Sequence, residues 1–397
     1  MAAKSTDAHV VVIGGGATGA GVAHDLALRG VRVTLLERGE LTSGTTGRHH
    51  GLLHSGGRYA VGDAESAAEC IRENTTLRAI APGSFEENGG LFVALTDDDM
   101  DYLDSFLDAC AASGIPTTVH KPDAALRLEP GLNPDVKIAV EVPDATVDPM
   151  RLVLRFFATA QRNGAELRTF TEVTGLSGSG RVVTGVLARD LVSERDYELS
   201  ADLVVNAAGP WSGQVARLAE VNVPMQLSPG VLLAVEGRFC GRVLNRLHKP
   251  SDGDIIVPQR GLSVVGTTSW VVGDPDVPPV PAEHVARMYA EGAKLVPALA
   301  TARRRAAWSA VRPLVGSGGA TTGRELSRTF QCFDHKQTEG VDGLVTITGG
   351  KATTLRAMGE AAADVVCAKL GIAASCQTAE TVLAPYSAYY QERGERQ

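Results

Sequence analysis

This sequence of 397 residues is poor in aromatic residues and has no excess of positive charge. Aromatic side chains make up 5% of the chain, too few to suggest rings that stack on nucleic-acid bases. The net charge is −8, which argues against binding that depends on neutralising a phosphate backbone. We therefore expect no nucleic-acid partner.

Cysteine pairs and long apolar runs are missing as well. No run of about 18 residues is both apolar and free of charge, and the first eight residues lack the order of a signal peptide. The cysteines never form a C-x-x-C pair, so we expect no metal or iron–sulfur site within these residues; they stand at positions 70, 110, 240, 332, 367 and 376. Scattered free thiols fit a reducing compartment, and we expect a cytoplasmic protein.

Glycine, in contrast, is abundant, with 44 residues. A β-branched run at residues 10–13 is typical of a buried strand and leads into Gly14-x-Gly16-x-x-Gly19, which opens a helix. A second strand follows and ends in Glu37. Glycines at this spacing let the backbone approach a pyrophosphate at a helix N-terminus, and the acid accepts hydrogen bonds from a ribose. The pattern therefore predicts a dinucleotide site.

The fingerprint alone does not separate NAD from FAD. No second fingerprint follows a strand elsewhere, and there is no redox-active cysteine pair. A flavoprotein reductase that uses NAD would carry two nucleotide folds, one for each cofactor. We therefore favour FAD, with electrons that leave to an acceptor other than a bound nicotinamide.

Two further strand-then-glycine segments, near residues 209 and 349, lie far from the first, with strand-rich sequence between them. The expected fold is α/β: a Rossmann-like FAD-binding domain built from discontinuous segments, with an antiparallel-sheet cap domain for the substrate. The expected boundaries are 8–80, 144–224 and 327–372 for the FAD-binding domain, 81–143 and 225–326 for the cap, and 373–397 for a C-terminal tail without a strong pattern. Helices are expected at residues 64–80, 98–113, 149–163, 284–297, 299–307 and 354–370.

Residues 43–59, rich in glycine, histidine and hydroxyl residues, are the most informative stretch. Small residues let a backbone line a flavin ring closely, and the histidines would put titratable groups beside it. Here the sequence resembles the FAD-dependent glycerol-3-phosphate dehydrogenases, within the D-amino-acid-oxidase-like flavoproteins, and most of all the catalytic large subunit of the anaerobic type. The segments that carry the resemblance are 47–59, 142–149, 204–211, 249–258, 265–269, 311–315 and 347–351.

The resemblance implies oxidation of sn-glycerol 3-phosphate to dihydroxyacetone phosphate by hydride transfer to flavin N5. It also implies that FAD is bound without a covalent link, and that electrons pass to a quinone or an electron-accepting partner subunit; an oligomer is possible. Two alternatives stay open. One is a dehydrogenase or oxidase of a 2-hydroxy acid or amino acid on the same fold, and the other is a non-catalytic subunit that holds FAD for electron relay.

Oxidation of a hydroxyl beside a phosphate needs cations that bind a dianion and a base that takes the hydroxyl proton. The resemblance places Arg312 and Arg328 at the substrate phosphate, where a planar guanidinium binds two oxygens at once. Lys351, at a helix N-terminus, would reach the flavin or the substrate. His54 is the expected general base or proton relay. With Arg58 these are the candidate catalytic residues; the other interpretation is ion pairs for the arginines, a solvated lysine and a loop hydrogen bond for His54.

The residues expected to bind the cofactor come from the fingerprint, the 43–59 stretch and the later glycine turns. They are Gly14, Gly16, Ala17, Thr18, Gly19, Glu37, Arg38, Gly44, Thr45, Thr46, Arg48, His50, Gly51, Leu52, Val173, Ala208, Gly209, Gly349, Gly350, Lys351 and Thr353. Trp211 is expected to pack in the core. The basic run 303–305, expected on a helix, is either a solvated face or a peripheral contact with anionic lipid on the inner face of the cell membrane.

Overall fold

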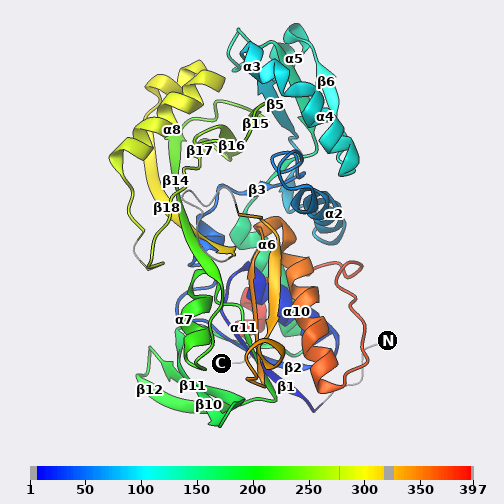
Figure 1. Ribbon diagram of the computed structural model, residues 1–397, viewed down its shortest axis with the longest axis vertical. Helices are drawn as coiled ribbons and strands as arrows, with labels where there is room; N and C mark the ends of the chain where they lie inside the picture. The colour runs from blue at the N-terminus through cyan, green and yellow to red at the C-terminus, as the bar shows by residue number, and fades with distance from the viewer. Residues whose placement is uncertain (1–6, 277, 317–325, 395–397) are drawn as a thin grey trace.

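The computed structural model describes residues 7–276, 278–316 and 326–394. Two large sheets organise the molecule and lie one above the other along its long axis (Figure 1). The lower sheet is mostly parallel and flanked by helices, and the upper sheet is mostly antiparallel. The predicted fold class is therefore confirmed.

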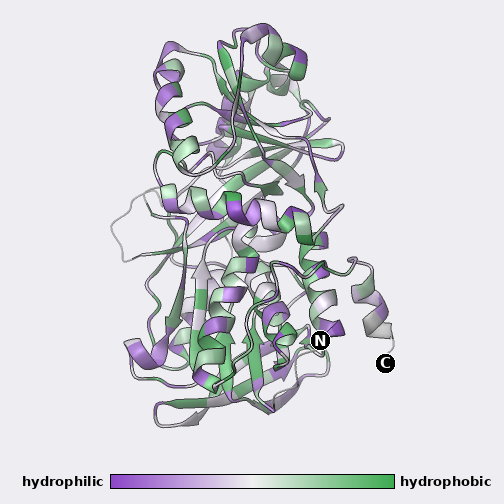
Figure 2. Cartoon of the chain, turned by 90° about the vertical axis from the view of Figure 1, so that its right-hand side faces the viewer, coloured by the Kyte–Doolittle hydropathy of each residue, from purple (hydrophilic) through white to green (hydrophobic). Residues whose placement is uncertain are grey.

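The lower, six-stranded sheet has the order β19-β20-β13-β1-β2-β9 and is parallel except for the pair β19–β20. Its strands are β1 (His9–Ile13), β2 (Arg32–Leu36), β9 (Glu166–Arg168), β13 (Leu203–Asn206), β19 (Phe330–Asp334) and β20 (Leu344–Gly349). Helices α1 (Ala17–Leu28) and α10 (Leu355–Leu370) pack against the sheet and against each other, and α6 (Pro149–Arg162) packs against α1. The strands are strongly hydrophobic in Figure 2, because parallel strands under helices are buried on both faces.

The upper, eight-stranded sheet has the order β18-β14-β17-β16-β15-β5-β7-β6, in which β15 and β5 run parallel and the other neighbours run antiparallel. Its strands are β5 (Gly90–Ala94), β6 (Thr118–His120), β7 (Ile138–Val142), β14 (Met225–Glu236), β15 (Val243–Arg246), β16 (Ile255–Gln259), β17 (Leu262–Gly266) and β18 (Arg304–Val315). The helices around it are α3 (Asp97–Asp101), α4 (Leu103–Ala112), α5 (Pro122–Leu128) and α8 (Ala282–Leu295). All eight strands fall in the two segments expected to form the cap, although the exact domain boundaries stay a prediction.

Two small sheets and several short helices complete the described fold. One sheet, at the lower tip in Figure 1, consists of β10 (Thr171–Ser179), β11 (Val182–Asp190) and β12 (Arg195–Ser200); the other consists of β3 (Leu52–Leu53), β4 (Phe85–Glu86) and β8 (Ala145–Val147). The remaining helices are α2 (Ala64–Ile80), α7 (Ser212–Arg217), α9 (His335–Thr338), α11 (Ala388–Gly394) and the 3-10 turns η1 (Thr45–Arg48), η2 (Gly209–Trp211), η3 (Pro297–Thr301) and η4 (Ala352–Thr354).

The structure corrects the expected helix at residues 299–307. Only the short turn η3 forms there, and β18 begins at Arg304, so the basic run leads into a strand. Alanine, leucine and arginine favour helix locally, but β18 pairs with β14 from Val315 opposite Met225 to Arg304 opposite Val235. Long-range pairing therefore overrides local propensity.

Two smaller corrections concern residues 98–113 and the C-terminal tail. The expected single helix is divided into α3 and α4 at Tyr102. The tail packs against α6 through α11, and Leu383 and Ala388 are buried.

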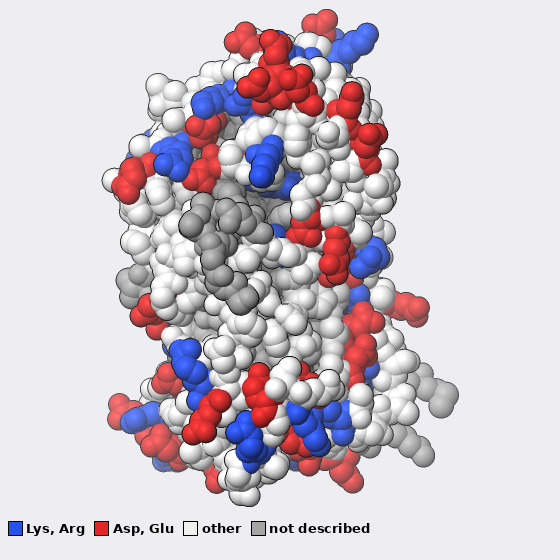
Figure 3. All heavy atoms as spheres, in the orientation of Figure 1, with Lys and Arg blue, Asp and Glu red and all other residues white. Residues whose placement is uncertain are grey.

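Among the described residues no helix combines the length and the apolar composition needed to cross a bilayer. On the face shown in Figure 3, positive and negative side chains are interspersed.

Candidate functional site

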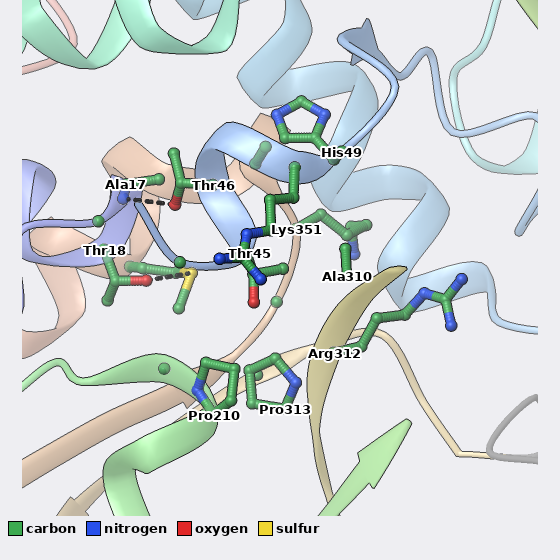
Figure 4. A pocket seen from close by; sticks show the side chains of 18 of the residues that line it. Ala17, Thr18, Thr45, Thr46, His49, Pro210, Ala310, Arg312, Pro313 and Lys351 are labelled. Atoms are coloured by element: carbon green, nitrogen blue, oxygen red, sulfur yellow. Dashed lines mark hydrogen bonds between the residues drawn. The ribbon is translucent and has the colours of Figure 1, made fainter. Parts of the chain in front are cut away.

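A cavity of about 1640 Å³ lies between the two sheets. Its lower wall is formed by the turns that follow β1, β2, β13 and β20, and its upper wall by β14, β18 and the segment before β16. The carboxyl ends of neighbouring parallel strands converge at such a place, which is where open α/β sheets bind ligands. Figure 4 shows side chains from both walls facing the same hollow.

The glycine fingerprint forms the lower wall by close backbone contact. Gly14 has φ +113°, and a Cβ at Gly14 would lie 2.6 Å from the carbonyl oxygen of Ala207 after β13. A Cβ at Gly19 would lie 1.9 Å from the carbonyl oxygen of Gly14. Gly16, the N-cap of α1, has no side chain to cap the helix and lines the cavity, so the positive end of the helix faces the cavity, as a pyrophosphate requires.

The acid at the end of β2 is held in place by backbone amides. Glu37 accepts hydrogen bonds from the backbone N–H of Gly15 at 2.7 Å and of Gly39 at 2.8 Å, and it lines the cavity. The carboxylate is therefore placed beside the fingerprint, where it can accept further bonds from ribose hydroxyls. This geometry fits a dinucleotide.

The loop over residues 43–59 is fixed between the two walls. The backbone N–H of Ala17 donates to Thr46 Oγ1 at 2.9 Å, drawn as a dashed line in Figure 4, which ties the loop to the start of α1. On the other side, Thr45 Oγ1 donates to the carbonyl oxygen of Val311 at 2.6 Å, and Gln259 Nε2 donates to that of His50 at 3.0 Å. The expected ordered loop therefore joins the lower body to the upper sheet.

Three histidines of this loop stand in a row along the cavity. The ring centroids of His49 and His50 are 6.1 Å apart, and those of His50 and His54 are 5.9 Å apart. Among the described residues, His49 Nε2 and His50 Nδ1 are buried without a hydrogen-bond partner. Because an unpaired buried polar atom is costly, this wall fits a ligand with polar ring atoms, such as a flavin.

Burial and positive neighbours keep these imidazoles neutral. Burial lowers the pKa of His49 to about 4. Burial, together with the charges of Arg58 and Lys351, holds the pKa of His54 well below its ordinary value. A neutral imidazole at pH 7 can accept a proton, so His54 can act as a base in the cavity wall.

The guanidinium of Arg312 enters the cavity from β18 (Figure 4). It donates to the carbonyl oxygens of Ser228 and Pro229, each at 3.3 Å, to that of Thr268 at 3.2 Å, and to Thr267 Oγ1. These four acceptors orient the guanidinium fork. Such an arginine is suited to an anionic ligand.

Arg58 reaches the same cavity from the end of the 43–59 loop. Its Nη2 forms an ion pair with Asp254 Oδ1 at 2.8 Å, and its Nη1 donates to Asn245 Oδ1 at 3.1 Å. Both partners belong to the upper sheet region, so Arg58 connects the two bodies at the cavity wall.

Lys351 and Arg328 are directly connected. Lys351 Nζ donates to the carbonyl oxygen of Arg328 at 2.8 Å, lies 5.2 Å from the ring centroid of Tyr59 and 3.6 Å from Glu69 Oε2. The sequence around Arg328 is strand-like, but Arg328 lies in an irregular segment just before β19. The five candidate catalytic residues all line the cavity.

Most of the residues expected to bind the cofactor line this cavity too. They are Gly14, Gly16, Ala17, Thr18, Glu37, Arg38, Gly44, Thr45, Thr46, Arg48, His50, Leu52, Val173, Ala208, Gly209, Gly349, Gly350 and Lys351. Gly19 lies behind Gly14, Gly51 lines a separate hollow, and Thr353 is buried and accepts a hydrogen bond from the backbone N–H of His54. The individual roles stay predictions.

A cluster at the cavity wall was not apparent from the sequence. Trp211, expected in the core, lines the cavity, and its Nε1 donates to Asp276 Oδ1 at 2.7 Å. The same oxygen accepts from Arg38 Nη2 at 2.9 Å, and the Arg38 guanidinium lies 4.6 Å from the Trp211 ring centroid. The position of Trp211 after a strand-ending glycine turn was a usable signal, whereas nothing in the sequence marked Asp276.

The site therefore combines a dinucleotide cradle, a neutral base and a group of cations around one cavity. The cradle fits FAD: the fingerprint turns and α1 would hold the pyrophosphate, Glu37 a ribose, and the 43–59 loop the ring. The cations and the base lie where that ring would meet a small anionic substrate.

Comparisons with known proteins agree with this geometry. A family model described as "FAD dependent oxidoreductase" (DAO) matches residues 9–365. The A subunit of the anaerobic glycerol-3-phosphate dehydrogenase from Escherichia coli (strain K12) is 46% identical over 381 residues, which cover 96% of this chain and 70% of that protein. Its counterpart from Haemophilus influenzae is 45% identical over 398 residues and covers 100% of this chain and 70% of that protein.

Solved structures extend the comparison. The glycerol-3-phosphate dehydrogenase from Bacillus halodurans, complexed with FAD, superposes with a TM-score of 0.75 at 25% identity and covers 100% of this chain and 72% of that one. Glycine oxidase from Bacillus cereus has a TM-score of 0.71 at 23% identity, covering 95% and 99%, and thus shares the fold. With the family model spanning most of its length, the chain belongs to the FAD-dependent oxidoreductases.

Proposed function

We propose that this protein is an FAD-dependent glycerol-3-phosphate dehydrogenase, which oxidises sn-glycerol 3-phosphate to dihydroxyacetone phosphate. The observation that carries the proposal is one cavity that joins the dinucleotide cradle to four basic side chains and a neutral histidine. The high identity to the A subunits of the anaerobic enzyme supports this substrate over others on the same fold.

In the proposed reaction, the cations bind the substrate through its phosphate. Arg312 presents a guanidinium oriented by neutral acceptors, and Arg58 and Lys351 add positive charge from the opposite wall. Binding the phosphate at a fixed place positions the carbon that bears the hydroxyl. A dianion is neutralised best by several cations in a partly enclosed site, which favours a phosphate over a neutral polyol.

His54 is the proposed base for the hydroxyl proton. Its pKa is held well below the ordinary range, first by burial and then by neighbouring positive charges, so it is neutral at neutral pH. The lowered pKa also makes it a weak base, and the negative charge of a bound phosphate would strengthen it. The same cations stabilise negative charge that develops on the substrate oxygen as the proton leaves. When bound, FAD supplies the acceptor for the hydride.

The electrons are proposed to pass to a quinone or to an electron-accepting partner subunit. The relatives are named as one lettered subunit of the anaerobic enzyme, which supports an assembly with further subunits. A cytoplasmic location fits the six free cysteines.

An anaerobic bleaching screen tests the proposal. The purified protein is expected to be yellow, and glycerol 3-phosphate is expected to bleach the flavin absorbance. Bleaching by 2-hydroxyglutarate or an amino acid, but not by glycerol 3-phosphate, would assign the other substrate class. A yellow protein that no substrate of either class bleaches would instead serve only to hold FAD.

A further inference from the structure

The segment over residues 249–258, one of those that carry the family resemblance, has a contact that the proposed function leaves unused. Its Asp254 lies directly before β16 and forms the ion pair with Arg58. Asn245, on β15, pairs with Ile255 in the ladder between β15 and β16, which brings its side chain beside Asp254. Two neighbouring strands of the upper sheet therefore present two acceptors to one guanidinium.

The arrangement is buried. The side chain of Asp254 is 3% exposed and that of Arg58 is 11% exposed. Asp254 Oδ2 accepts from the backbone N–H of Ser251 at 2.6 Å, which leaves Oδ1 for Arg58. Asn245 is fully buried, and its Oδ1 accepts a hydrogen bond from the second guanidinium nitrogen, Nη1. Both bonds of Arg58 are thus directed by buried side chains, and the carboxylate of Asp254 is held in turn by the backbone of Ser251.

Arg58 itself stands on a turn pressed between the two bodies. A Cβ at Gly56 would lie 2.5 Å from the carbonyl oxygen of Ala67 on α2, and one at Gly57 would lie 2.9 Å from the Phe92 ring on β5. The backbone is therefore fixed up to Arg58, but a long side chain still has several rotamers. The acceptors from the upper sheet select one of them.

We propose that Asp254, together with Asn245, is a positioning residue that aims the guanidinium of Arg58 at the substrate anion from across the boundary between the two bodies. This inference rests on the proposed function, because it assigns the anion to the same site. Asp254 is separated from the substrate by Arg58, so it acts through that side chain. Without its carboxylate, Arg58 loses its fixed direction and the anion loses a preoriented donor.

A double-mutant cycle tests this mechanism. Asp254→Asn keeps the shape of the side chain but removes its charge, and we expect KM for glycerol 3-phosphate to rise about ten- to a hundredfold with flavin content unchanged. In an Arg58→Lys background the same substitution is expected to change KM by less than about twofold, since the group that it acts through is gone. Asp254→Glu, which keeps the charge, should recover part of the loss.

Asp252→Asn is the matched control. Asp252 lies in the same segment and pairs with Arg287, away from Arg58, so its substitution should leave KM within about twofold of the wild type. An unchanged KM in Asp254→Asn, or an equal rise in the wild-type and Arg58→Lys backgrounds, would overturn the inference, because the effect would then be absent or purely structural. Flavin content and thermal midpoint, measured on every variant, show whether each has folded.

The proposed function is tested separately. Bleaching of the wild-type flavin by glycerol 3-phosphate depends on the substrate assignment and is measured before the cycle. If the wild type bleaches and the cycle is additive, only the role of Asp254 fails; if the wild type does not bleach, the substrate assignment fails.

Discussion

The two walls of the cavity are built to contact ligands in different ways, one with backbone groups and the other with charged side chains. The lower wall works through backbone: glycines, amide groups and a helix N-terminus lie so close together that side chains have no room. The upper wall and the loop facing it work through long charged side chains, each oriented by acceptors that lie far away in the sequence. We infer that the first wall is rigid and intolerant of change, whereas the second can be altered without losing the cofactor.

The largest expected effect comes from filling the backbone wall. In Gly19→Val a Cβ would lie 1.9 Å from the carbonyl oxygen of Gly14, so the fingerprint turn must move. We expect a protein without bound flavin and a loss of about 1–3 kcal/mol or more in stability. The ratio of absorbance at flavin and protein wavelengths measures the first, and urea unfolding the second.

Gly261→Ala provides the comparison, because a Cβ there would meet no atom within 4 Å among the described residues and Gly261 does not line the cavity. It should retain flavin fully. Stoichiometric flavin in Gly19→Val would contradict the view that this wall is rigid.

The next effect concerns the side-chain wall. Arg312→Ala should retain flavin, because its guanidinium is held by the upper sheet and not by the fingerprint. Loss of a charged hydrogen-bonding group costs about 1.5–3 kcal/mol, which is roughly ten- to a hundredfold in kcat/KM. Steady-state kinetics should show a higher KM and a lower kcat.

Arg312→Lys should lie between the wild type and Arg312→Ala, since it keeps the charge without the fork. Full activity in Arg312→Ala would remove this residue from the site. Loss of flavin in the same variant would show that the two walls are not independent.

An effect of intermediate size is expected from pH, which should change the free energy of unfolding through His24 on α1. His24 on α1 is fully buried, and burial together with the charge of Arg356 lowers its pKa to about 3. The unfolded chain therefore binds a proton at higher pH than the folded protein does. The free energy of unfolding should fall by up to about 1.4 kcal/mol per pH unit as the pH drops from 6.5 toward 3.

Urea unfolding at pH 7 and pH 5.5 measures this dependence. In His24→Gln, which does not titrate, the difference in unfolding free energy between the two pH values should be smaller than in the wild type by about 1.3 kcal/mol. An identical difference in the wild type and the variant would show that other groups cause the pH dependence.

The two walls also differ in how far the sequence alone could predict them. The fingerprint, Glu37 and α2 were predictable because the residues that define them are close together in the chain. The acceptors of Arg58 were not, because Asp254 is 196 residues away and no local pattern pairs the two. The prediction of a helix at residues 299–307 was wrong for the same reason, since the pairing of β18 with β14 is a long-range contact that no local pattern reveals.

The smallest expected effect is on stability and on the rate of flavin release, and it comes from the contact between the two walls. Asp276 Oδ1 accepts from both Arg38 and Trp211, and thereby ties the upper body to the dinucleotide side. Since these groups are partly exposed, Asp276→Asn should lose about 1 kcal/mol or less, and bound FAD should dissociate about two- to fivefold faster. The fluorescence of released flavin measures the rate.

Glu40→Gln, an exposed acid near Arg38 in the chain, is the control and should release flavin at the wild-type rate. An unchanged rate in Asp276→Asn would mean that this contact does not retain the cofactor.

The position of β20 has a consequence for biosynthesis. This strand comes late in the sequence but lies inside the six-stranded sheet, between β19 and β13, and the turn after it carries Lys351. A nascent polypeptide on the ribosome thus possesses its nucleotide fingerprint long before it gains this inner strand. Loading of the coenzyme therefore has to wait for β20, and products terminated before that strand expose the apolar edge of β13 to chaperones and proteases.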